Sequence, residues 1–244
     1  MSVLLLDAGR VPGGAATPQA PLLPDPPRPA FTVPKGLPLG RSGTETRWAP
    51  VLRPVAARAS PDGRAPVVAR LATTTPEGTS NLVLVVGRTV DEDGLLWLRA
   101  RLPVLPNGTT GWLPRPALGG YGVVNTRLIV DLDRLSATLF RDGRRVFSAP
   151  AGVGTPEFPT PRGEFYVRNE LRSMSPFYGP LAFGTSARSS VLTDWPGGGF
   201  IGIHGTDRPD LLPGRVSHGC IRLRNEDILR LGSLMPVGTP VTVR

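Results

Sequence analysis

The sequence has few of the residues that cross-link a chain or hold it in a membrane. It contains one cysteine, Cys220, and one lysine, Lys35, among 244 residues. A single cysteine excludes an internal disulfide, so the cysteine count does not indicate the compartment in which the protein works. No apolar run approaches the roughly 18 residues that a transmembrane helix requires, so we expect no integral membrane segment.

The first residues do not have the pattern of a secretory signal. MSVLLLDAGR contains a four-residue apolar run that ends at Asp7, with no basic residue before it. A signal peptide needs about 7–15 apolar residues after a basic segment. Export would therefore need another route or a different start of translation.

Positive charge is in excess, and nearly all of it is arginine. The net charge is +9, and the arginines are scattered along the chain. A nucleic-acid-binding surface is typically a basic stripe with aromatic residues between the charges, and none is visible, so we expect no nucleic-acid partner. The charge would attract polyanions such as anionic cell-wall polymer, or it reflects a GC-rich genome.

The composition changes along the first half of the chain. Residues 1–47 are rich in Pro and Gly and predict a tail or linker. Residues 48–118 contain apolar runs at 82–86, 95–102 and 110–114, separated by turn residues, which predicts a small β module. Its ending, GWLPR after LLWLRARL, resembles bacterial SH3-like domains and implies a barrel that binds the cell wall or packs on the rest of the chain.

The second half of the chain predicts a mainly β domain over residues 125–244, after a glycine-rich hinge at 119–124. Asp142-Gly143 is a hairpin turn signal. Asn225, with two acidic residues after it, predicts the cap of a helix that ends before Pro236. We expect strands at 127–132, 137–141, 146–149, 163–168, 200–204 and 239–243, and a long loop or lid between residues 169 and 199.

Both histidines and the cysteine lie within seventeen residues, as His204, His218 and Cys220. A thiol attacks an acyl carbon as the thiolate, and a nearby imidazole that accepts its proton makes this possible at neutral pH. Gly219, beside the cysteine, allows the backbone to approach a substrate closely. Backbone N–H groups at such a position stabilise the charge that develops on the substrate oxygen.

These residue types and their spacing leave three interpretations open. Cys220 and the histidines form a nucleophilic site, or they have structural roles, since an unpaired cysteine is commonly a small buried apolar residue. The third interpretation is a zinc site in which the three side chains and a water bind the metal. His-x-Cys spacing on a tight loop is unusual for zinc.

A longer motif surrounds these three residues. The run IGIHGTDRPDLLPGRVSHGCIRL, residues 201–223, resembles the signature of the bacterial L,D-transpeptidases. TPRGEF at 160–165 and Asn-Glu-Asp at 225–227 are also similar to that family, and the resemblance covers about residues 123–244. It implies a β-sandwich catalytic domain in which Cys220 is the nucleophile and His204 the general base, with no metal and no other cofactor.

The resemblance also implies roles for the residues around this pair. His218 would shape the pocket, and its backbone would join those of Gly219 and Cys220 as the oxyanion hole. Ser217 would belong to the same oxyanion-hole and pocket segment. Arg222 would pair with a substrate carboxylate, with a surface salt bridge as the alternative. Gly205 can orient His204 only through its main chain. Aromatic residues of the expected lid would contact substrate or pack internally, namely Phe177, Tyr178, Phe183 and Trp195.

A family member of this kind would be a peptidoglycan L,D-transpeptidase in the cell envelope. It would take an acyl group from a tetrapeptide stem, release D-Ala and transfer the acyl group to an amine of a second stem. Donor and acceptor stem peptides would be its partners, and we expect a monomer. The alternatives are an L,D-carboxypeptidase, an enzyme that anchors proteins to the wall, a non-catalytic wall-binding protein and a zinc hydrolase.

Overall fold

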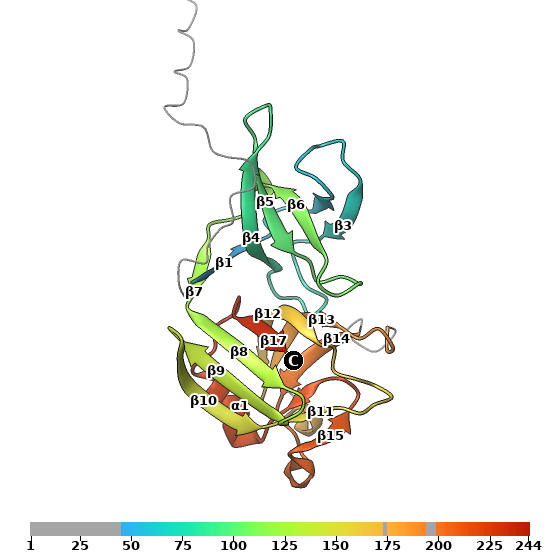
Figure 1. Ribbon diagram of the computed structural model, residues 1–244, viewed down its shortest axis with the longest axis vertical. Coiled ribbons are helices and arrows are strands. Elements are labelled where there is room, and N and C mark those ends of the chain that lie inside the picture. The colour runs from blue at the N-terminus through green and yellow to red at the C-terminus, as the bar shows by residue number, and fades with distance from the viewer. Residues whose placement is uncertain (1–44, 173–174, 194–198) are drawn as a thin grey trace, which may run out of the picture. The chain divides into compact units, whose positions relative to one another are not determined.

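The computed structural model describes residues 45–172, 175–193 and 199–244, all within one compact unit. Residues 1–44 of the predicted tail and Trp195 lie outside the described residues. The described elements appear in Figure 1 and run in the order β1 (Thr46–Pro50), β2 (Val55–Arg58), β3 (Val67–Leu71), β4 (Leu82–Val90), β5 (Leu96–Arg101), β6 (Thr110–Pro114), η1 (Arg115–Ala117), β7 (Gly122–Val124), β8 (Thr126–Asp131), β9 (Ser136–Arg141), β10 (Arg144–Pro150), β11 (Gly152–Gly154), β12 (Gly163–Arg172), η2 (Pro176–Tyr178), β13 (Leu181–Arg188), β14 (Phe200–His204), η3 (Pro209–Leu211), β15 (Gly214–Ser217), β16 (Ile221–Arg222), α1 (Asn225–Gly232) and β17 (Pro240–Val243).

The first seven strands form one sheet in the order β3-β2-β6-β5-β4-β1-β7. We call this part of the chain, residues 45–124, the N-terminal β module. All of its strand pairs are antiparallel, and its own core includes Val83, Leu98 and Leu113. β7 pairs with β1, so the segment predicted as a hinge contains a strand. The SH3-like identity of the module stays a prediction.

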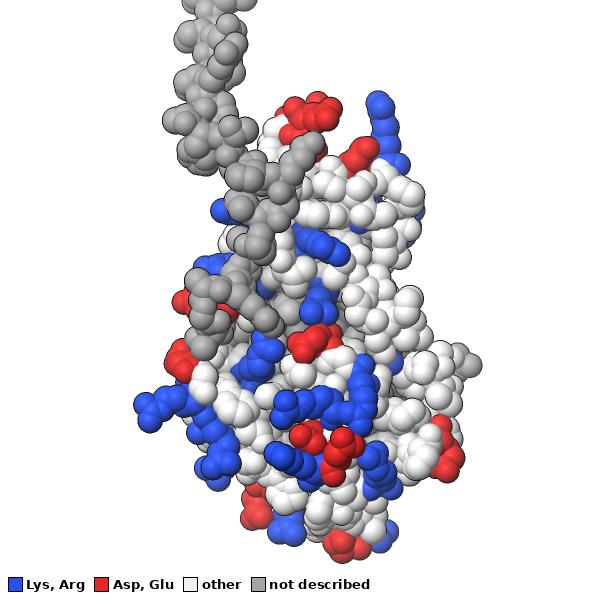
Figure 2. All heavy atoms as spheres, in the orientation of Figure 1, with Lys and Arg blue, Asp and Glu red and all other residues white. Residues whose placement is uncertain are grey.

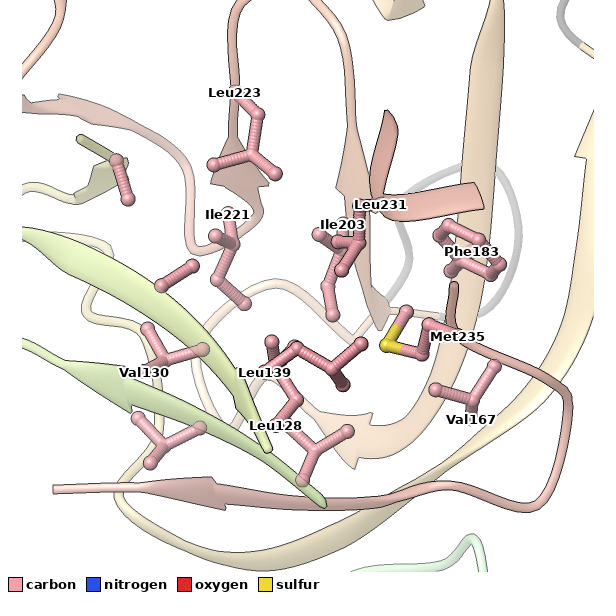
Figure 3. Close-up of a cluster of buried hydrophobic side chains, with 14 of the residues drawn as sticks. Leu128, Val130, Leu139, Val167, Phe183, Ile203, Ile221, Leu223, Leu231 and Met235 are labelled. Atoms are coloured by element: carbon pink, nitrogen blue, oxygen red, sulfur yellow. The ribbon is translucent and has the colours of Figure 1, made fainter. Parts of the chain in front are cut away.

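The remaining ten strands form a second sheet in the order β10-β9-β8-β17-β12-β13-β14-β16-β11-β15. β12 belongs to both halves of this sheet, because its first four residues pair with β17 and its later residues pair with β13. The two halves pack as a β-sandwich around one core, which confirms the mainly β prediction. In Figure 3, Leu128 and Leu139 lie opposite Ile203 and Ile221 across this core.

The predicted hairpin at Asp142-Gly143 is present between β9 and β10. Both residues have positive φ, 50° and 75°, which suits Asp and Gly and matches the twist of the flanking strands. Strand β14 occupies the predicted residues 200–204. Both predictions rested on a few adjacent residues, the Asp-Gly turn signal at 142–143 and the apolar segment at 200–204.

Two local predictions were wrong. The stretch between residues 169 and 199 is not a long loop, because β12 continues to Arg172 and β13 covers Leu181–Arg188. Asn225 does not cap α1, because Arg224 occupies the cap position and makes no side-chain capping bond. The Asn225 side chain instead accepts the N–H of Thr206 at 2.9 Å, a contact distant in sequence.

The charged side chains are dispersed. On the face seen in Figure 2, basic and acidic groups lie among uncharged ones and form no continuous basic stripe. Within the described residues, no helix is both long enough and apolar enough to cross a membrane.

Candidate active site

A single pocket brings together most of the residues that the sequence motif indicated. Cys220, His204, His218 and Arg222 all line it, together with Tyr178. Its remaining lining residues are Phe177, Ser189, Leu192, Gly199, Phe200 and Ile201. Gly205 and Ser217 are not among its lining residues, but Gly205 is hydrogen-bonded to His204 and Ser217 to Cys220.

Two neighbouring parallel strands position the cysteine and the histidine. β14 ends at His204, and β16 begins directly after Cys220. The strands pair so that Ile203 lies opposite Ile221 and His204 opposite Arg222. Both isoleucines are fully buried in the core, which fixes the strand ends above them. The pairing explains why the last residue of β14 and the residue before β16 meet in one pocket.

Gly202 lies between the sulfur and the imidazole. Its N–H donates to Cys220 Sγ at 3.3 Å. A methyl group at this glycine would lie 3.8 Å from His204 Cδ2 and 3.9 Å from Cys220 Sγ. Thiol and imidazole therefore flank the same small space. The absence of a side chain at Gly202 leaves that space available to a reacting group.

The His204 ring is held in one orientation by the main chain. Nδ1 lies 2.6 Å from the carbonyl oxygen of Gly205. A carbonyl oxygen can only accept, so Nδ1 carries the proton and Nε2 is the acceptor of the neutral ring. This is the main-chain contact expected of Gly205. His204 is 2% exposed, and burial, together with the positive charge of Arg222, lowers the imidazole pKa from 6.5 to about 4.

The Cys220 thiol rests in its protonated form. Burial raises its pKa above the usual value, and this effect outweighs the Gly202 N–H and the charge of Arg222, which both favour the thiolate. Thiol and imidazole are therefore both neutral at neutral pH. The arrangement suits a base that takes the proton only as the sulfur attacks.

The loop that carries Cys220 is fixed by hydrogen bonds at both ends. Ser217 Oγ donates to the Cys220 carbonyl at 2.6 Å and accepts the Gly219 N–H at 3.1 Å. Thr160 Oγ1 donates to the Gly219 carbonyl at 2.8 Å and accepts the Gly154 N–H at 2.9 Å. Gly219 has φ +111°, a conformation that other residues rarely adopt. Its N–H is engaged by Ser217, so Gly219 contributes conformation rather than a donor.

Arg222 is a buried cation on the wall of the pocket. It is 8% exposed, and its guanidinium carbon lies 4.8 Å from the centroid of the Phe177 ring. Its Nε has no hydrogen-bond partner within the described part of the chain. A buried donor without a partner is unfavourable, and an anionic ligand would satisfy it.

The aromatic residues predicted to contact substrate are not all found at the pocket. Tyr178 packs edge-on against His204 with ring centroids 4.9 Å apart, and both Tyr178 and Phe177 are partly exposed. His218 is exposed and stacks at 4.8 Å on Phe158. Trp195 lies outside the described residues, so its predicted contact with substrate stays a prediction.

The described residues contain no cluster of three or more His, Cys, Asp or Glu side chains that could hold a metal ion. His204 already donates through Nδ1 to a carbonyl group, and Cys220 Sγ accepts a backbone N–H. Both side chains are therefore held by main-chain groups of β14 and of the residue that follows it.

Three residues that hold the site together were not recognised as site residues from the sequence. In the sequence, Thr160 stands out only as part of the TPRGEF motif, Asn225 as a predicted helix cap within the Asn-Glu-Asp motif, and Gly202 as one residue of the run 201–223. The signal for Thr160 was its place in the TPRGEF motif. Nothing in the sequence indicates that Gly202 contacts the sulfur, because that contact depends on the pairing of β14 with β16.

Comparison with known proteins gives a consistent picture. The model of the YkuD family, described as the L,D-transpeptidase catalytic domain, matches residues 125–243. The YkuD proteins of Bacillus licheniformis and Bacillus subtilis (strain 168), both named as L,D-transpeptidases, are 31% identical over 128 residues. This match covers 52% of this chain and 71% of each relative.

A shorter match is higher in identity. The YbiS protein of Escherichia coli (strain K12), also named as an L,D-transpeptidase, is 59% identical over 39 residues, or 16% of this chain and 13% of that protein. Among solved structures, an L,D-transpeptidase from Mycobacterium smegmatis aligns with 61% of this chain and 90% of that chain, at 19% identity and a TM-score of 0.40.

Proposed function

Because the chain belongs to the YkuD family of L,D-transpeptidase catalytic domains, we propose that it is a peptidoglycan L,D-transpeptidase with Cys220 as nucleophile and His204 as general base. One observation carries the proposal. The neutral imidazole and the thiol flank the same glycine, with His204 Nδ1 tied to the Gly205 carbonyl. This leaves Nε2 as the acceptor for the thiol proton.

In the proposed first step, Cys220 attacks the amide between the third residue of a tetrapeptide stem and its terminal D-Ala. The thiol proton passes to His204 Nε2 as Sγ bonds to the carbonyl carbon. Negative charge develops on the carbonyl oxygen, where the Cys220 N–H is the nearest candidate donor, since the Gly219 N–H is engaged. Collapse breaks the C–N bond, and His204 returns its proton to the D-Ala nitrogen.

In the proposed second step, an amine of an acceptor stem attacks the thioester. Its nitrogen bonds to the acyl carbon, and His204 takes the proton that the nitrogen loses. The C–S bond then breaks, and the sulfur regains its proton from His204. The products are a cross-linked peptide and the free enzyme, so this chemistry needs neither a metal nor an organic cofactor.

Arg222 is proposed to bind a carboxylate of the stem. Its buried Nε without a protein partner supports this role. A planar guanidinium can bind a carboxylate through two parallel hydrogen bonds, which orients the peptide as well as holding it. Its stacking on Phe177 would keep the guanidinium plane fixed before the ligand arrives.

The proposed place of action is the cell envelope, where this substrate lies. The net charge of +9 would favour the neighbourhood of anionic wall polymer. Because exposed charges are screened over about 10 Å at 0.1 M salt, this attraction would be weak and salt-sensitive.

Product analysis tests the proposal directly. The protein is incubated with a purified disaccharide-tetrapeptide, and protein and products are analysed by mass spectrometry. We expect a dimer that lacks one D-Ala, and an acyl adduct on Cys220. Cys220→Ala should form neither product nor adduct.

The two histidines of the pocket provide a matched pair. His204→Ala should lower the rate by about 100-fold or more, the usual contribution of a general base. His218→Ala should lower it much less, because His218 is exposed and stacks on Phe158. A tripeptide product without dimer would identify an L,D-carboxypeptidase. No product and an unmodified Cys220 would contradict an enzymatic function with this substrate and favour wall binding.

A further inference from the structure

A polar cluster far from Cys220 in sequence lies behind the wall of the pocket. Glu77, in the turn 75–79 of the N-terminal β module, meets Arg168 and Asn169 of β12. Arg168 Nη2 donates to both carboxylate oxygens of Glu77, at 3.0 and 3.2 Å. Arg168 and Asn169 are 2% and 3% exposed, so both side chains are held without access to water.

The turn that carries Glu77 is closed by its own hydrogen bonds. The Thr75 N–H donates to the Thr79 carbonyl at 2.8 Å, and the two threonine hydroxyls are hydrogen-bonded at 2.8 Å. Asn169 Nδ2 contacts the Thr79 hydroxyl at 3.0 Å and Glu77 Oε2 at 3.1 Å. The turn therefore presents several acceptors to one buried amide.

One path leads from this cluster to Phe200. Arg168 Nε donates to the Thr185 carbonyl at 3.0 Å, and its guanidinium carbon lies 3.6 Å from the centroid of the Phe200 ring. Phe200 lines the pocket of Cys220. A guanidinium fixed by a carboxylate and a carbonyl group is a rigid surface for an aromatic ring.

A second path leads from the same cluster to the sulfur. β12 and β13 shift register between Val167 and Asn169, and at that position Asn169 Oδ1 accepts the Gly184 N–H at 3.0 Å. Gly184 pairs with Gly202 on β14, and the Gly202 N–H donates to Cys220 Sγ. The amide of Asn169 thus holds the strand pair that reaches the sulfur.

We propose that Glu77 is a positioning residue for the Cys220 pocket, which it acts on from the N-terminal β module. Through Arg168 it fixes Phe200 on the pocket wall. Through Asn169 it fixes the Gly184–Gly202 pair whose N–H contacts Sγ. The module is then a structural part of the active site, and this holds whichever reaction Cys220 performs.

The test uses the full chain and alkylation of Cys220 by iodoacetamide, followed by mass spectrometry across pH. Glu77→Gln replaces an oxygen acceptor by an N–H₂ group that faces donors. We expect alkylation at pH 7 to slow by about 3- to 10-fold, the effect of weakening one hydrogen bond to the sulfur. The midpoint of the alkylation profile should move to higher pH, because the thiolate loses part of a donor.

Glu92→Gln is the matched control. It makes the same change at an exposed glutamate of the same module, and it should alkylate like the wild type. A folded Glu77→Gln that also alkylates like the wild type, with only its melting temperature lowered, would show a purely structural role and overturn the proposal. If Glu77→Gln does not fold, Thr79→Val provides the test. It removes one hydrogen-bond acceptor of Asn169, so it should slow alkylation of Cys220 to a smaller extent. An unchanged alkylation rate in Thr79→Val would overturn the proposal.

Alkylation separates this proposal from the proposed function. If the wild type forms no peptide product, the transpeptidase function fails while the alkylation comparison still decides the role of Glu77. If product does form, Glu77→Gln should lower kcat more than it raises KM, since Glu77 lies behind the pocket wall and has no place among the pocket residues.

Discussion

At the scale of single residues, burial sets the charge state of the site. His204 and Cys220 shift in opposite directions, the imidazole pKa downward and the thiol pKa upward, and desolvation is the largest cause of both shifts. Both shifts favour the neutral form. Arg222 adds a fixed positive charge beside them, which disfavours the imidazolium and favours the thiolate. A carboxylate bound to Arg222 would offset that charge as the proton moves to His204.

The His204 pKa predicts a pH-dependent stability. In the unfolded chain the imidazole binds a proton below about pH 6.5, whereas in the folded protein it does so only near pH 4. The unfolded state therefore holds more protons between these values, and stability falls as the pH falls through this window. The expected loss between pH 7 and pH 4 is about 3 kcal/mol from this residue alone.

Urea unfolding of the wild type and His204→Asn at pH 7 and pH 4 measures this contribution. Carboxylates titrate in both proteins and cancel in the comparison, so the wild type should lose about 3 kcal/mol more than the variant. Equal losses in the wild type and His204→Asn would contradict the buried neutral imidazole.

At the scale of elements, prediction succeeded where the signal was local. The apolar segment 200–204 and the Asp142-Gly143 turn each depend on a few adjacent residues, and β14 and the β9–β10 hairpin are as predicted. β13 was missed because its GTSAR segment is polar, and its burial depends on partners distant in sequence. Thr185, for example, is 1% exposed and donates to the Ile201 carbonyl at 2.6 Å.

The start of α1 also differs from the prediction, because Arg224 and not Asn225 occupies the cap position. The Asn225 side chain is therefore free to contact another segment. Asn225 Oδ1 accepts the Thr206 N–H, which holds the segment that follows His204 and presents the Gly205 carbonyl to Nδ1. Asn225→Ala removes the acceptor, so kcat/KM should fall by about 10-fold as the imidazole loses its orientation.

Asn225→Asp retains an acceptor oxygen and should stay close to the wild type in kcat/KM. The free energy of unfolding should fall by about 1 kcal/mol in the Ala variant, because the Thr206 N–H loses its partner. Steady-state kinetics and urea unfolding of the two variants make the comparison. Equal kcat/KM values for Ala and Asp would show that the side-chain oxygen does not orient the site.

At the scale of the whole molecule, the motif indicated residues that line the pocket and did not indicate the distant residues that contact them. Cys220, His204 and Arg222 lie within one contiguous signature and were predicted together. Glu77 and Asn169 are separated by about half of the described chain, and nothing near either of them in sequence predicts the contact. A polar cluster between residues of two different sheets depends on tertiary structure alone.

The contact between the module and the catalytic domain also has an apolar part. Tyr166 of β12 is fully buried with Leu82 and Leu84 of β4, and Trp48 and Val237 pack against this cluster. The Tyr166 hydroxyl donates to the Leu82 carbonyl at 3.1 Å. Residues of both parts therefore share one buried cluster, so neither part can unfold without exposing apolar surface of the other.

This shared cluster predicts that the two parts unfold in one transition. Of the four tryptophans, Trp48, Trp97 and Trp112 lie in the module, so fluorescence mainly follows the module. Cys220 lies in the catalytic domain, so the reaction of its thiol with a disulfide reagent follows that part. In urea the two probes should give the same midpoint.

Tyr166→Phe should lower the free energy of unfolding by about 1–2 kcal/mol, because the buried Leu82 carbonyl loses its donor. The decrease should be the same whether unfolding is followed by fluorescence or by the thiol reaction. If the module and the catalytic domain unfold independently, the two probes will give different midpoints, and Tyr166→Phe will shift only one of them.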